Sequence, residues 1–239
     1  MHLGLLICDH ARLELNHPDG SYPEMFRRLL PDFEIRDYYV CDGVFPVNPD
    51  ECDGWLISGS RLSVYEEVDW IIRLKEFVKL IRDSGRPCIG VCFGHQMIGE
   101  ALGGKVMKAP GGWCTGVHPF DIQIPQPWMD PPQDKVNLLM MCQDQVIQLP
   151  PDTRVLATSL HIPNGMIRVG RNMLGIQGHP EFSVDFEEQL IRINAQYLAP
   201  GQAEEDLESL KQPVHSGVVT QWMAEFLRTA DGRPQTADR

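Results

Sequence analysis

The chain has 239 residues, of which 43% are hydrophobic and 23% charged, and its formal net charge is −12. This length and hydrophobic content suit a single domain with a sizeable core, and the acidic excess argues against a nucleic-acid-binding surface, which is normally basic. No apolar stretch approaches the length of a transmembrane helix, so we expect no membrane partner. The first eight residues carry no basic segment and predict a strand rather than a signal peptide.

Seven cysteines form an odd set without the spacing of a disulfide scaffold. Several lie in apolar runs, so a reducing cytoplasm is the expected setting. The proximity of Cys88, Cys92 and His95 suggests a metal site. However, Cys88 belongs to an apolar run and no fourth ligand is near in sequence, so we expect neither zinc nor another metal.

In the first half of the chain, short apolar runs alternate with amphipathic segments. Strands are expected at residues 3–8, 33–40, 54–58 and 87–91. Helices are expected at residues 22–30 and 70–81, and residues 10–20 form a polar loop. Nearly continuous apolar strands are typical of a parallel sheet that is buried on both faces.

The second half continues the alternation with more strand signals. A short helix at 97–102 is followed by strands at 105–108, 117–124 and 137–141. A hairpin at 165–169 and 173–177 precedes helices at 184–198 and 217–227. The whole predicts one doubly wound α/β domain, residues 1–239, with a mostly parallel central sheet and helices on both faces. Its core covers residues 1–199, followed by a helical extension (200–227) and a polar tail (228–239).

The most informative segment is GVCFGHQ, residues 90–96. A cysteine between two glycines at a strand-to-helix turn is the thiol version of a nucleophile elbow. The start of the following helix favours negative charge, and hence the thiolate of Cys92. A buried structural cysteine is the alternative, because free cysteine is often buried. The segment therefore needs a base elsewhere in the chain.

The sequence QGHPE, residues 177–181, supplies a base at the end of another apolar run. His179 can take the proton of the thiol, and Glu181 can orient the imidazole and stabilise its cation. The order cysteine, histidine, acid differs from that of the α/β-hydrolases, where the acid precedes the histidine. We therefore predict a catalytic triad of Cys92, His179 and Glu181. His95 lacks such a carboxylate neighbour, and we treat the remaining histidines as surface or structural residues.

With LISGS at residues 56–60, these motifs resemble the class I (triad) glutamine amidotransferases. The resemblance covers about residues 52–186. The chain is similar to the glutaminase domain of GMP synthetase, and it is more similar still to stand-alone γ-glutamyl peptidases. It implies a cysteine-dependent amidase that acts on a small γ-glutamyl amide and needs no cofactor.

The resemblance also implies substrate contacts. The backbone N–H groups of Ser60 and Phe93 form an oxyanion hole, Gly59 contacts the substrate, and Gln96 hydrogen-bonds it. Ser60 stands where the family often has glycine, so its backbone is more restricted. Cys142 and Gln143 belong to a segment whose backbone helps to hold the α-amino and α-carboxylate groups. Alternatively, Gln96 is an exposed helix residue and Cys142 is merely packed.

The sequence leaves three questions open: the specificity for glutamine, the roles of two aromatic residues, and the type of activity. Met141 and Cys142 replace the family's usual Ser-His, which puts glutamine specificity in question, and Trp113 and Tyr22 either line the substrate mouth or simply pack. The chain is a self-contained γ-glutamyl amide hydrolase, a glutaminase subunit that delivers ammonia to a separate synthetase, or a catalytically silent binding or regulatory protein on the same scaffold. It has no segment typical of an ATP pyrophosphatase, so the second choice requires a partner chain.

Overall fold

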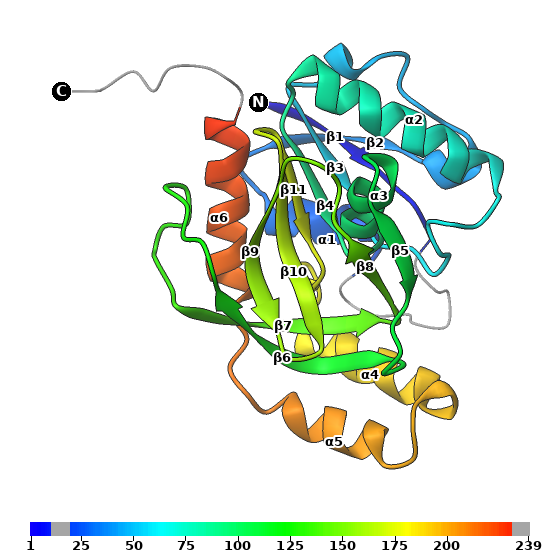
Figure 1. The fold of residues 1–239 in the computed structure, drawn as a ribbon, viewed down its shortest axis with the longest axis vertical. Helices are drawn as coiled ribbons and strands as arrows, with labels where there is room; N and C mark the ends of the chain where they lie inside the picture. Colours follow the sequence, from blue (N-terminus) through cyan, green and yellow to red (C-terminus); the bar gives the residue numbers. More distant parts are fainter. Residues whose placement is uncertain (11–19, 231–239) are drawn as a thin grey trace.

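The computed structural model describes residues 1–10 and 20–230 (Figure 1). The loop predicted at 10–20 and the polar tail predicted from 228 lie almost entirely outside this range. Among the described residues, no helix is both long enough and apolar enough to cross a membrane.

Nine strands in the described part of the chain form one sheet, and two more form a small antiparallel sheet. In spatial order the large sheet contains β2 (Glu34–Tyr38), β1 (His2–Leu6), β3 (Gly54–Ile57), β4 (Cys88–Val91), β11 (Met173–Ile176), β10 (Ile162–Val169), β9 (Thr153–Ser159), β6 (Cys114–Ile122) and β7 (Lys135–Cys142). The small sheet pairs β5 (Lys105–Lys108) with β8 (Asp144–Gln148).

The first five strands of this order are mutually parallel. The last four are joined by antiparallel pairing, beginning with the predicted hairpin of β10 and β11. Strands β3, β4 and β11 are buried along their whole length, as their continuous apolar sequences predict. This topology confirms the predicted α/β class with a largely parallel centre.

Helices cover both faces of the parallel strands (Figure 1). One face packs against α1 (Tyr22–Leu29) and α6 (Ser216–Thr229), and the other against α2 (Asp69–Ser84) and α3 (Phe93–Ala101). Neighbouring residues of β1 divide between the two: Leu5 packs in the cluster of Phe26 and Trp222, whereas Leu6 packs in the cluster of Phe77. This division follows from the alternation of side chains along a strand.

Two further helices, α4 (Val184–Asn194) and α5 (Gln202–Ser209), pack beside β6 and β7 (Figure 1). Side chains of α4 such as Phe186 share a cluster with Val117 and Leu139 of these strands. Short 3-10 turns lie at Val40–Asp42 (η1), Pro49–Glu51 (η2) and Ala195–Tyr197 (η3).

Several element boundaries differ from the sequence expectations. Strands β8 and β9 and helix α5 are not predicted from sequence, because each contains only two or three apolar residues, which polar or charged residues flank. The helix predicted at 184–198 ends as an α-helix at Asn194 and continues only as η3. Strand β6 begins at Cys114, three residues before the predicted start, and ends at Ile122.

Candidate active site

The three motifs meet where the parallel strands end. Ser58 follows β3, Cys92 follows β4, and Gln177 follows β11, and these three strands are neighbours in the sheet. In open α/β sheets, ligands bind outside these carboxyl ends. A cavity of about 330 Å³ lies there, and its lining includes Gly59, Cys92 and His179.

Cys92 occupies a strained turn between β4 and α3. Its backbone has φ +50° and ψ −102°, a region that non-glycine residues rarely adopt. A Cβ on Gly90 would lie 2.2 Å from the carbonyl oxygen of Gly94, and a Cβ on Gly94 would lie 2.4 Å from that of Ile57. Both glycines are therefore needed because helix α3 approaches the strands so closely. The side chain of Cys92 is consequently held at the N-terminus of α3.

His179 and Glu181 form a buried pair. Nδ1 of His179 lies 2.8 Å from Oε1 of Glu181, and both side chains are almost completely shielded from solvent. The backbone N–H of His179 donates to the carbonyl of Leu139 in β7 at 2.9 Å. The imidazole stacks on the ring of Phe182, with centroids 4.0 Å apart and an interplanar angle of 5°. Glu181 and Phe182 thus set the orientation of the imidazole, and the hydrogen bond to β7 fixes the backbone that carries it.

The electrostatic surroundings of His179 favour its charged form. Burial works against an imidazolium, but the charges of Glu181 and Cys92 outweigh it and raise the pKa of His179 well above its ordinary value. Within the described residues, neither Nε2 of His179 nor Oε2 of Glu181 makes a hydrogen bond. The Nε2 atom is therefore available to exchange a proton with a thiol or a substrate.

The predicted oxyanion-hole residues follow two neighbouring strands, β3 and β4. Ser60 is half-buried in the turn after β3 and lines the cavity, as does Gly59. The Ser60 hydroxyl accepts a hydrogen bond from the backbone N–H of Leu62 at 3.2 Å, which stabilises this turn. Phe93 is the first residue of α3, where backbone N–H groups have no partner within the helix. Its ring packs against Trp70, with centroids 5.7 Å apart, so only its backbone is placed to serve the site.

The predicted substrate residues also lie at the cavity. Gln96 lines it but is only 3% exposed, so the alternative of an exposed helix residue is wrong. Its Nε2 donates to the carbonyl of Asp144 at 2.8 Å and to Oε1 of Gln177 at 3.3 Å. Cys142 and Gln143 line the same cavity. Cys142 is also well buried, and burial together with the charge of Cys92 raises its pKa well above the ordinary value.

His95, the other histidine near the predicted nucleophile, is packed away from the cavity. It is fully buried, and neither ring nitrogen has a hydrogen-bonding side chain or carbonyl within the described residues. Burial lowers its pKa to about 4. A Cβ on Gly175 of β11 would lie 2.5 Å from its Nδ1 atom. A neutral, enclosed imidazole of this kind is unsuited to act as the base.

The structure adds residues to the cavity that sequence reasoning missed or left undecided. Charged residues occupy one part of the lining: Arg61, Glu66, Lys108 and Asp144. Mainly apolar residues of α1, α4 and two loops also line the cavity: Tyr22, Trp113, Phe182, Phe186 and Leu190. The positions of Trp113 and Tyr22 favour the substrate mouth over simple packing. No local sequence signal could place α4 there, because its contact with β6 and β7 is tertiary.

Several of the remaining histidines have polar partners in the structure. Nδ1 of His215 accepts a hydrogen bond from the N–H of Asn137 at 2.9 Å, and Nε2 of His10 lies 3.0 Å from a carboxylate oxygen of Asp42. Both partners lie far away in sequence, and these contacts agree with the surface or structural roles expected for the two histidines. His17 lies outside the described residues.

Known proteins resemble this chain in sequence. A family model described as "Glutamine amidotransferase class-I" matches residues 41–195. A relative named γ-glutamyl peptidase 4, from Arabidopsis thaliana, is 34% identical over 175 residues, which cover 70% of this chain and 70% of the relative. A glutamine-hydrolysing GMP synthase from Bacillus velezensis is 33% identical over 164 residues, which cover 68% of this chain but only 28% of that protein.

Solved structures resemble its fold. The crystal structure of a glutamine amidotransferase from Thermotoga maritima superimposes with a TM-score of 0.73, covering 98% of this chain and 100% of the other, at 18% identity. This likeness supports the shared fold alone. The family match, the sequence relatives and the cavity at the strand ends agree with one another, and the chain belongs to the class-I glutamine amidotransferase family.

Proposed function

We propose that this protein hydrolyses a γ-glutamyl amide bond through a γ-glutamyl thioester on Cys92, without a metal or an organic cofactor at the reaction centre. One observation carries the proposal. Cys92, in its strained turn, and His179, paired with the buried Glu181, both line a single cavity. A catalytically silent protein has no need to bury such a pair beside a cysteine in a strained conformation. The family membership supports the same reaction class.

Acylation begins with attack of the Cys92 thiolate on the γ-carbonyl carbon. The tetrahedral oxyanion accepts hydrogen bonds from the N–H groups of Ser60 and Phe93. The imidazolium of His179 donates its Nε2 proton to the leaving amine, and the C–N bond breaks to leave the thioester. Glu181 stabilises the imidazolium beforehand, which is consistent with the raised pKa of His179.

Deacylation uses the same groups in reverse. The neutral imidazole of His179 takes a proton from water, and the hydroxide attacks the thioester carbonyl. The same two N–H groups stabilise the second oxyanion. The C–S bond breaks, so the Cys92 thiolate is restored beside the imidazolium, and the γ-carboxylic acid of glutamate is released and loses its proton to solvent.

The cavity lining suits a γ-glutamyl group with a substituted leaving amine. Arg61 and Lys108 offer positive charge for the α-carboxylate, while Glu66 and Asp144 offer negative charge for the α-ammonium group. Arg61 is held in place by Asp9, whose carboxylate accepts hydrogen bonds from its Nε and Nη2, each at 2.7 Å. We assign the backbone of Cys142 and Gln143 to the same group, together with Gln96.

The apolar part of the lining favours a hydrolase over a simple glutaminase. Trp113, Phe186 and Leu190 line the cavity together with the charged residues. Ammonia, the leaving group of glutamine, has no apolar surface to bury against them, whereas the side chain of a γ-glutamyl peptide or amide has. The relative of similar length carries the name of a γ-glutamyl peptidase. We therefore place a self-contained γ-glutamyl hydrolase first.

Ammonia delivery is the second candidate, because a GMP synthase resembles this chain over 28% of its own length. That reading requires a separate synthetase chain. For either activity we propose a cytoplasmic setting, which is supported by the absence of disulfides among the seven cysteines, all of them in described residues.

Steady-state kinetics on the purified chain separate these candidates. Substrates should include glutamine, γ-glutamyl methylamide and γ-glutamyl-phenylalanine, with Cys92→Ala as the blank. A hydrolase turns over the phenylalanine derivative without a partner and with a higher kcat/KM than glutamine. Turnover of glutamine alone, appearing only after a synthetase is added, would replace this proposal with ammonia delivery.

A further inference from the structure

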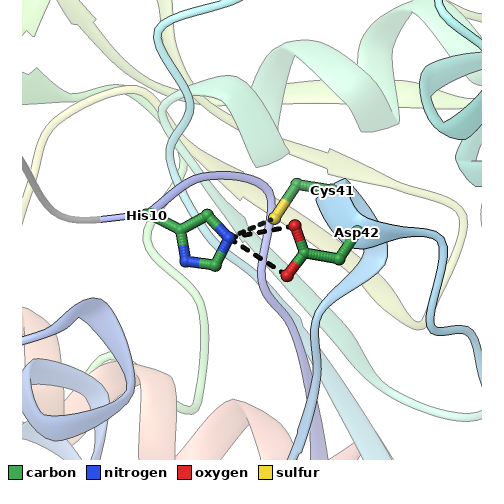
Figure 2. Close-up of side chains that lie close together, drawn as sticks. All are labelled: His10, Cys41 and Asp42. Atoms are coloured by element: carbon green, nitrogen blue, oxygen red, sulfur yellow. Dashed lines mark hydrogen bonds and ion pairs between the residues drawn. The ribbon is translucent and has the colours of Figure 1, made fainter.

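A second cluster of reactive side chains lies outside the cavity. It contains His10, which follows β1, and Cys41 and Asp42 of the 3-10 turn η1 (Figure 2). One ligand atom from each residue can be chosen such that all three lie within 4.8 Å of one another. None of the three residues lines the cavity that holds Cys92.

The separations in this cluster match those of ligands around a small metal ion. Nε2 of His10 lies 3.0 and 3.1 Å from the two carboxylate oxygens of Asp42 and 3.8 Å from Sγ of Cys41. Zinc binds nitrogen at about 2.0 Å and sulfur at about 2.3 Å, so tetrahedral geometry separates such a pair by about 3.5 Å. A metal ion therefore needs only a small adjustment of the side chains to enter.

A hydrogen bond between His10 and Asp42 explains the two short distances. It does not explain why the sulfur of Cys41 lies close to the same nitrogen. Cys41 brings its sulfur to the same ring nitrogen, as Figure 2 shows. A thiolate and a carboxylate together carry two negative charges, which a divalent cation neutralises. Soft sulfur and imidazole ligands select zinc-like transition metals over magnesium or calcium.

The backbone holds the three residues in position before any ion binds. The N–H of Cys41 donates to the carbonyl of Ile7 at 3.2 Å, and that of Asp42 donates to the carbonyl of Tyr39 at 3.0 Å. The imidazole of His10 stacks on the ring of Tyr39, with centroids 5.5 Å apart. The side chains of His10 and Asp42 are 56% and 51% exposed, so a fourth coordination position faces water.

We propose that His10, Cys41 and Asp42 form a binding site for one zinc-class divalent metal ion, with water as the fourth ligand. This site is independent of the proposed hydrolase function. Asp9, the neighbour of His10, connects it to the cavity by accepting hydrogen bonds from the lining residue Arg61. The sequence alone does not reveal it, because 31 residues separate His10 from Cys41.

Metal titration tests this inference directly. The experiment uses the full chain carrying Cys92→Ser, so that the thiol beside His179 does not bind zinc itself. Zinc binding is measured by competition with a chromogenic chelator, and cobalt(II) is then used as a spectroscopic probe. We expect one equivalent of zinc, and with cobalt a near-ultraviolet absorption band from a thiolate ligand.

Three variants and two controls locate the ion. Each of His10→Ala, Cys41→Ser and Asp42→Asn should weaken zinc binding at least tenfold, and Cys41→Ser should abolish the cobalt–thiolate band. Two controls should leave both signals unchanged: His2→Ala, which changes another exposed histidine that pairs with an acid, and Cys114→Ser, whose thiol lies 3.4 Å from His118. Circular dichroism verifies that each variant is folded.

The stability of the protein gives a second readout. Because only the folded state assembles the three ligands, saturating zinc should raise the Tm of the Cys92→Ser protein and should not raise that of the same protein with Cys41→Ser. The inference is overturned if the Cys92→Ser protein binds no zinc, or if zinc binding and the cobalt band survive Cys41→Ser.

Discussion

Nδ1 of His179 lies 2.8 Å from Oε1 of Glu181, and solvent reaches almost none of either side chain. Because the pair is buried, the charge of Glu181 acts on the imidazole with little screening. Together with Cys92, it raises the pKa of His179 despite the opposing effect of burial. The two residues are separated by Pro180 alone, so the sequence holds them together locally.

This pair gives the first prediction. Glu181→Gln should lower kcat about 10²-fold, because an amide oxygen still accepts the Nδ1 hydrogen bond but cannot stabilise the imidazolium. His179→Ala should cost about 10⁴-fold or more. In Glu181→Gln the pKa of His179 should fall, so the alkaline limb of the pH–kcat profile should move to lower pH. An equal loss in both variants, with no shift of that limb, would contradict the assigned role.

Gly94 provides a prediction about the turn that holds Cys92. Its Cβ would lie 2.4 Å from the carbonyl oxygen of Ile57, so Gly94→Ala must push α3 away from β3. We expect a loss of several kcal/mol in the free energy of unfolding, together with lost activity. Gly217→Ala is the matched control, because nothing lies within 4 Å of the added atom. It should stabilise the protein by up to about 1 kcal/mol. Urea unfolding measures both.

The buried carboxyl of Glu187 predicts how stability depends on pH. Glu187 is fully buried; its Oε1 accepts a hydrogen bond from the N–H of Gly116 at 3.2 Å, and its Oε2 has no hydrogen-bond partner within the described residues. Burial, the largest cause, raises its pKa to about 8. The folded protein therefore retains a proton that the unfolded chain releases above its ordinary pKa of about 4.5. Stability is present in full below that value and is lost as the pH rises through about 8.

Glu187→Gln should remove this pH dependence. Compared with the variant, the unchanged protein should lose up to about 1.4 kcal/mol of unfolding free energy per pH unit across that window. The exposed neighbour Glu188, which pairs with Arg192, offers the control Glu188→Gln, and it should leave the slope unchanged. Urea unfolding at several pH values measures these slopes of unfolding free energy against pH. Parallel slopes for the protein and Glu187→Gln would show that Glu187 is ionised throughout.

Trp113 tests whether the apolar part of the cavity holds the leaving group. Trp113→Ala should raise KM about tenfold for γ-glutamyl-phenylalanine, because that side chain loses apolar contact, and should change KM for glutamine little. Tyr197→Ala, which removes a 63% exposed aromatic residue outside the cavity lining, should affect neither substrate. An equal effect of Trp113→Ala on both substrates would place Trp113 against the γ-glutamyl group instead.

The parts of the fold predicted from sequence are those with local signals. Strand β4, the Cys92 turn and the His179-Pro180-Glu181 segment each carry their pattern within a few residues, and the fold and family they imply are confirmed. Strand β9 and helix α5 carry weak patterns, and their positions depend on packing against distant strands. The contribution of α4 to the cavity and the cluster of His10 with Cys41 arise from tertiary contacts. The hydrophobic periodicity of the sequence does not encode such contacts.

Trapping the acyl-enzyme tests the central claim most directly. The purified chain is mixed with a γ-glutamyl amide, quenched in acid within the first turnovers, and examined by mass spectrometry of the intact chain and its peptides. Our account predicts one added γ-glutamyl group, located on Cys92, and neither adduct nor turnover in Cys92→Ala. Near-normal turnover by Cys92→Ala, or an adduct on another cysteine such as Cys142, would contradict it.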